Sequence, residues 1–157
     1  MGEFADDVIV RLKDRLEREL PFYRWETEYR IVETPVDVGG VADDSYILVE
    51  LEWRRADPAD NAAKIFRHLS KSRAVEGTVT VVQLFTDYYD LASGGVSSKR
   101  KNAEFVGEVA AESLGRMSYH PLDFDIDPPK AGEERFTEWK ETTDSMAATV
   151  SSMIEHP

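Results

Sequence analysis

The most hydrophobic strand expected in this chain carries two acidic residues that are two positions apart. Residues 46–54 read YILVELEWR, an apolar stretch typical of a buried strand, and Glu50 and Glu52 lie in its second half. Side chains alternate between the two faces of a strand, so both glutamates point to the same side. A buried carboxylate without a partner is costly, and two adjacent ones also repel each other. The strand can be buried only if something compensates the two charges.

One possible compensation is a solvent-facing strand with basic neighbours. Glu50 and Glu52 would then form ion pairs with Arg54 or Arg30 on an exposed face. Leu48 occupies the same face, however, and an aliphatic side chain is not typical of a solvated surface. The pattern therefore favours a bound cation over a solvated face, and both explanations remain open at this point.

Length and composition exclude several classes of protein. At 157 residues the chain is expected to form one domain, residues 1–157. No apolar run approaches membrane-spanning length, and the N-terminus lacks the layout of a signal peptide, so we expect a cytoplasmic protein without a membrane partner. The absence of cysteine excludes a disulfide framework and a thiolate metal site.

The charge balance is strongly acidic. The chain has 31 acidic and 19 basic residues, seven of them lysines and twelve arginines, for a net charge of -12. This acid-rich, lysine-poor and cysteine-free composition resembles that of proteins from salt-loving archaea, where a dense negative surface stays hydrated while salt screens its self-repulsion. An acidic mesophilic protein is the alternative.

Periodicity and turn residues predict an α/β domain with a mixed sheet. A helix, three strands, a helix and a fourth strand are followed by a helical C-terminal extension, with residues 118–134 irregular. The predicted helices are 3–20, 58–72, 99–116 and 134–155, and the predicted strands are 23–33, 36–42, 46–54 and 78–86. The second and third strands should form a hairpin, and the fourth should run parallel to one neighbour because it follows a helix.

In the order of its helices and strands, the core, residues 3–86, resembles the PD-(D/E)XK nuclease superfamily, which has the restriction-endonuclease-like fold. The family signature is an aspartate on the second strand and Glu-x-Lys on the third. Asp37 in PVDVGGV and Glu50 in VELEW match it, whereas Glu52 replaces the usual lysine and Val36 separates the proline from the aspartate. A Glu-x-Glu version occurs in some restriction enzymes. The resemblance implies metal-dependent hydrolysis of DNA, with RNA not excluded.

A metal site at the two strands agrees with the chemistry of the residues. Asp37, Glu50 and the backbone carbonyl of Leu51 offer the oxygen ligands that Mg²⁺ or Mn²⁺ prefers. Such an ion can polarise a phosphodiester and lower the pKa of an attacking water. Glu52 would position that water, accept its proton or help to hold a second ion. The turn residues 43–44 are acidic competitors for the role of Asp37.

The missing lysine has a candidate replacement on the following helix. Lys64 and Asn61 flank its apolar stripe, so long side chains there can lean toward the carboxylates. We expect Lys64 to contact the scissile phosphate with support from Asn61. A solvated helix flank is the alternative.

Basic residues that could contact the nucleic-acid backbone gather in two segments. Residues 54–73 contain six basic residues against two acidic ones, and SSKRKN adds three more at a predicted helix start. The expected contacts are Arg54, Arg55, Asn61, Arg67, Lys99, Arg100 and Lys101, and Arg73 belongs to the first segment. The alternative function is a non-catalytic module that retains the nuclease fold and binds nucleic acid or protein.

The last predicted helix carries an apolar seam with spacings of three and four. Its members are Phe136, Trp139, Thr143, Met146, Val150 and Met153. Such a seam packs either on the sheet or against a second copy of the chain, so a homodimer through this helix is possible.

Overall fold

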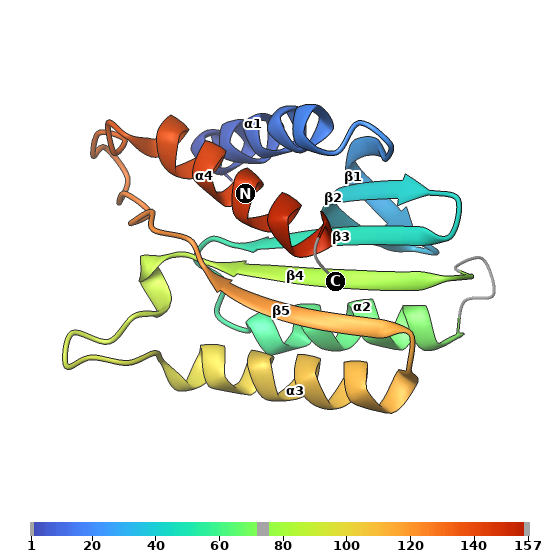
Figure 1. Cartoon of the computed structure of the whole chain (residues 1–157). Helices are drawn as coiled ribbons and strands as arrows, with labels where there is room; N and C mark the ends of the chain where they lie inside the picture. The colour runs from blue at the N-terminus through green and yellow to red at the C-terminus, as the bar shows by residue number, and fades with distance from the viewer. Residues whose placement is uncertain (1, 72–75, 156–157) are drawn as a thin grey trace.

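The computed structural model describes residues 2–71 and 76–155, which form a five-stranded mixed sheet between two layers of helices (Figure 1). Arg73 lies outside the described residues. Along the chain the elements are α1 (Glu3–Glu19), β1 (Arg24–Ile31), β2 (Thr34–Ala42), β3 (Ser45–Glu52), α2 (Pro58–Lys71), β4 (Thr78–Phe85), the 3-10 turn η1 (Asp87–Tyr89), α3 (Ser98–Leu114), β5 (Met117–Asp123) and α4 (Trp139–Glu155). The strand order is β1-β2-β3-β4-β5, antiparallel from β1 to β3 and parallel from β3 to β5.

Alternating side chains of β3 divide the core between the two faces of the sheet. Val49 and Leu51 point into the cluster covered by α1 and α4, whereas Leu48 points into the cluster covered by α2. Glu50 and Glu52 continue the alternation of Leu48 and are therefore directed toward the α2 side. Figure 1 shows α1 and α4 on one face and α2 and α3 on the other.

Strands β2 and β3 separate at one end of their ladder. Their pairing ends at Val38 and Val49, whereas β2 continues to pair with β1 as far as Thr34. We call the opening between them the fork, bounded by residues 34–37 and 50–52. Because β3, β4 and β5 are parallel, the loops that follow them lie at the same edge of the sheet as the fork.

The α/β class, the mixed sheet and its flanking helices are confirmed. The predicted β2–β3 hairpin and the parallel strand at 78–86 are both present. Strand β5 was not predicted, since residues 118–134 were expected to be irregular. It is a half-buried edge strand containing Pro121, so it lacks both the apolar alternation and the β-branched run of an internal strand. Helix α4 begins at Trp139, five residues later than predicted.

Two of the helices show why the sequence folds locally as it does. In α1 the four-residue spacing of Phe4, Val8, Leu12 and Leu16 places all four in the core. Helix α2 begins at Pro58, and the Asp57 side chain accepts a hydrogen bond from the backbone N–H of Asp60 at 3.2 Å. In the described chain, none of the helices is both long and apolar enough to cross a membrane.

The apolar seam of α4 packs against the core of the same chain. Thr143, Met146 and Val150 are buried, and the last two join the core formed by α1 and the sheet, with Trp139 and Met153 packed against it. This packing was one of the two alternatives for the seam. The homodimer considered from the sequence would need the same side chains, so this seam does not supply its interface.

Two glycines let β2 lie close to the rings of β1, next to Asp37. A Cβ on Gly40 would lie 2.7 Å from the Trp25 ring. We therefore expect Gly40→Ala to lower the free energy of unfolding by about 1–3 kcal/mol through overpacking, measured by urea denaturation. Gly2→Ala, where an added Cβ meets nothing within 4 Å, is the control. An unchanged urea midpoint for Gly40→Ala would contradict this packing.

Candidate functional site

Asp37 and Glu50 meet in the fork. Their carboxyl groups are close enough that each shifts the pKa of the other. The Oδ2 atom of Asp37 also accepts a hydrogen bond from the backbone N–H of Leu51 at 2.7 Å. Where the β2–β3 ladder ends, the Asp37 side chain therefore takes the place of the β2 backbone as the hydrogen-bond partner of β3. The turn acids 43–44 lie at the opposite end of this hairpin and are not part of the site.

Glu50 is a buried acid with an unused oxygen. Its side chain is only 5% exposed, and its Oε2 atom is buried without a hydrogen-bond partner. Burial, followed by the negative charges of Asp37 and Glu52, raises the pKa of Glu50 well above its ordinary range. Burial also raises the pKa of Asp37, although the Leu51 N–H, Glu50 and Arg55 oppose the shift.

Glu52 is completely buried and is held from α2 and β4. The Asn61 side chain donates from Nδ2 to both carboxylate oxygens, at 2.8 and 3.1 Å. Burial raises the pKa of Glu52 to about 7, while hydrogen bonds from Asn61 and Gln83 and the charge of Arg55 oppose the shift. Glu52 is therefore close to half-ionised at neutral pH.

Gln83 is a site residue that the sequence interpretation missed. It lies beside Glu50 in the β3–β4 register and is 2% exposed. Its Nε2 donates to the Pro58 carbonyl at 3.1 Å, and its Oε1 accepts from the Tyr119 hydroxyl at 2.6 Å. A lone glutamine inside the run TVTVVQLF was the available signal, because a buried amide in such a strand needs polar partners.

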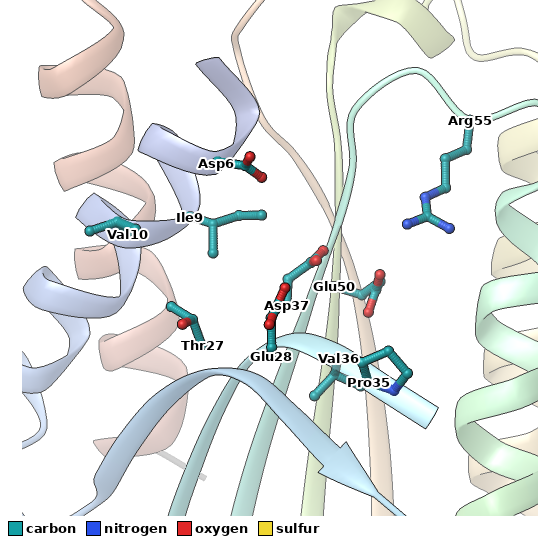
Figure 2. Close-up of a pocket in the computed structure, with 10 residues that line it drawn as sticks. All are labelled: Asp6, Ile9, Val10, Thr27, Glu28, Pro35, Val36, Asp37, Glu50 and Arg55. Carbon is teal, nitrogen blue, oxygen red and sulfur yellow. The ribbon is translucent and has the colours of Figure 1, made fainter. Parts of the chain in front are cut away.

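A pocket of about 350 Å³ opens onto the fork. Figure 2 shows that α1 borders it on one side, that Glu28 and Asp37 lie at its strands, and that the Arg55 side chain extends toward Glu50 from the loop after β3. Asp6 of α1 also lines it, so the pocket combines several acids with one arginine.

A smaller pocket of about 140 Å³ shares Glu50 and Arg55 with the first and is also lined by Asn61 and Lys64. Lys64 is thus near the acids, as expected. Its Nζ atom, however, lies 3.0 Å from the Asp60 carboxylate, one turn earlier on the same helix. Asn61 supports Glu52 rather than Lys64.

The other predicted nucleic-acid contacts are scattered. Arg54 and Lys99 both lie over the ring of Tyr88, near the edge of the sheet that holds the fork. Arg67 and Lys101 are exposed on α2 and α3. Arg100 is buried, pairs with Glu104 and Asp123, and lies over the Phe85 ring. It has a structural role in the fold and is not available as a nucleic-acid contact.

The solvent-face explanation of the two glutamates is wrong. Both are buried, and neither forms an ion pair with Arg54 or Arg30. Within residues 2–71 and 76–155, no group of three or more histidine or acidic side chains is arranged to hold a metal ion. Any cation in the fork would therefore rely on two carboxylates and backbone oxygen.

The donor set of the fork fits a hard divalent cation. Asp37 and the unpartnered Oε2 of Glu50 are carboxylate ligands. The N–H and C=O of one strand residue point to the same neighbouring strand, so the Leu51 carbonyl also faces β2, beyond the end of the ladder. Asp37 and Glu50 line the same pocket, so these two carboxylates face one opening.

No model of a known protein family matches this chain, and a comparison with curated proteins finds no significant relative.

The raised pKa of Glu52 predicts a pH-dependent stability. The folded state keeps a proton between pH 4.5, the ordinary pKa, and about 7, where the unfolded chain has lost it. Stability therefore falls as the pH rises through this window, by up to about 3 kcal/mol from Glu52 alone. Urea unfolding at fixed KCl should show that Glu52→Gln removes this part of the slope. The exposed Glu26→Gln should keep the wild-type slope, and a wild-type stability that rises from pH 5 to 7.5 would contradict the account.

Proposed function

We propose that this protein is a metal-dependent nuclease that hydrolyses phosphodiester bonds in DNA and belongs to the restriction-endonuclease-like fold. The observation that carries the proposal is Glu50, a buried carboxyl group with one oxygen unpartnered, which lines an open pocket together with Asp37. Two acids in this setting lower the stability of a protein unless they are protonated or bind a cation. Such a cost is typical of a functional site.

The arrangement of the core supports the same proposal. A helix, a three-stranded antiparallel meander, a helix and a parallel fourth strand bring the second and third strands side by side. Asp37 and Glu50 are on these two strands, at the end where they separate. The resemblance based on PVDVGGV and VELEW requires the two acids to meet, and the geometry is consistent with it.

The residues of the fork would hold the cofactor. Asp37, Glu50 and the Leu51 carbonyl are the proposed ligands of Mg²⁺ or Mn²⁺. When bound, such an ion supplies Lewis-acid polarisation of the phosphodiester and lowers the pKa of a water molecule. Because the pKa of Glu50 is raised well above its ordinary range, binding of a cation would release a proton, so affinity should rise with pH.

Glu52 is the proposed proton acceptor. Burial raises its pKa to about 7, near the value that suits a proton acceptor for an attacking water at neutral pH. Asn61 fixes its orientation through two hydrogen bonds. Asn61 acts through Glu52 and is a positioning residue.

A binding module without hydrolytic activity is the second candidate function. It is favoured by the position of the Glu52 carboxylate, which is fully buried and already receives hydrogen bonds from Asn61 at both oxygens. A side chain so engaged is a poor third metal ligand. Binding of nucleic acid in the absence of any cleavage would support this function.

The nuclease proposal is tested by incubating plasmid, linear and single-stranded DNA, and RNA, with Mn²⁺ or Mg²⁺ over KCl concentrations from low to molar. We expect cleavage of DNA by the wild type and a loss of at least about 10³-fold in Glu50→Ala, since a ligand of the metal is removed. Asp43→Ala, in the exposed turn between β2 and β3, should keep full activity.

Two results would reject the mechanism. Full activity in Glu50→Ala would exclude the fork as the site of hydrolysis. A wild-type protein that cleaves no substrate with either metal would exclude the nuclease and leave the binding module.

A further inference from the structure

We propose that Arg55, rather than Lys64, is the cation that binds the phosphodiester at the fork, and that Tyr89 is its positioning residue. The inference rests on the proposed nuclease function and identifies the group that meets the substrate phosphate. Neither residue was assigned this role from the sequence, where Arg55 was one of several general backbone contacts.

The backbone of Arg55 is fixed by a buried side chain. The Tyr89 hydroxyl accepts a hydrogen bond from the Arg55 N–H and donates one to the Arg55 carbonyl, both at 2.9 Å. Tyr89 is fully buried, and its ring packs edge-on against Phe85 with 5.4 Å between the centroids. A loop residue held at both of its backbone groups by one core side chain has a defined position.

The guanidinium of Arg55 is directed into the site but has no acidic partner. Its Nη1 donates to Oδ1 of Asn61 at 3.2 Å, and within the described chain it forms no ion pair. Figure 2 shows the group extending toward Glu50. Asn61 therefore uses its two ends differently, since its Nδ2 holds Glu52 and its Oδ1 receives Arg55.

Lys64 is less suited to the same role. Its charge is paired with Asp60 at 3.0 Å on the exposed surface of α2, and both side chains are about half exposed. Lys64 lines only the smaller pocket, whereas Arg55 lines both pockets that contain Glu50. Binding of a phosphate by Lys64 would require that ion pair to rearrange.

The chemistry of the pocket makes one fixed cation necessary. Asp6, Glu28, Asp37 and Glu50 line the larger pocket, so a phosphodiester approaching the fork meets mostly negative charge. A guanidinium matches two phosphate oxygens with parallel N–H groups and stays charged at every relevant pH. The positive charge of Arg55 also acts on the three acids. It lowers the pKa of Asp37, Glu50 and Glu52, in opposition to the effect of burial.

Binding can be measured without cleavage by fluorescence anisotropy of a labelled DNA duplex, with Ca²⁺ in place of Mn²⁺. We expect Arg55→Ala to weaken binding by about 10-fold and to reduce the slope of log affinity against log salt by about one, because one phosphate contact is lost. Tyr89→Phe keeps the ring and removes the hydroxyl, so it should weaken binding in the same direction. Lys64→Ala and the exposed Arg24→Ala, at the far end of β1, should stay within about 2-fold of the wild type.

The same variants are then compared in cleavage with Mn²⁺. Arg55→Ala should lower kcat by about 10²-fold, as expected for loss of one donor to the transition state. Arg55→Lys should recover part of this loss. Thermal unfolding of each variant separates these effects from a loss of fold.

The outcomes distinguish this inference from the proposed function. If the wild type cleaves DNA and Lys64→Ala loses more than Arg55→Ala, or if Arg55→Ala is unchanged in affinity and salt slope, the assignment of Arg55 is wrong and the nuclease remains. If the wild type binds DNA in an Arg55-dependent way but cleaves nothing, the phosphate contact stands and the nuclease fails. If it neither binds nor cleaves, both are rejected.

Discussion

Burial of negative charge at the end of β3 is the constraint on which the rest of the site depends. Glu50 and Glu52 lie at 5% and 0% exposure beside Asp37, and burial raises the pKa of each of the three acids. Desolvating three carboxylates lowers the stability of the fold at neutral pH. Hydrogen bonds from Asn61 offset this cost at Glu52. At Glu50, a cation bound in the fork would offset it.

The two glutamates of β3 therefore have separate roles. Asn61 satisfies both carboxylate oxygens of Glu52. Glu50 keeps an oxygen without a partner, and it lines a pocket together with Arg55. A fully satisfied acid and an unsatisfied one, side by side, are what a general base and a cation ligand require.

Sequence was sufficient for the parts of this arrangement that depend on local pattern. The hairpin of β2 and β3 follows from their turn, and it brings Asp37 to Glu50 without knowledge of the rest of the fold. Gln83 and Tyr89 could not be assigned, because their partners come from the parallel crossover and from a loop whose path no periodicity describes. Strand β5 escaped detection because half-buried edge strands lack a clear alternation.

Crystallography with Mn²⁺ can show whether the fork between Asp37 and Glu50 binds a divalent cation. Crystals grown above pH 7.5 in the presence of Mn²⁺ should give an anomalous difference peak in contact with the carboxylates of Asp37 and Glu50. Crystals of Glu50→Gln should lack the peak. A wild-type map from the same conditions without manganese at this position would show that the fork does not bind the cation.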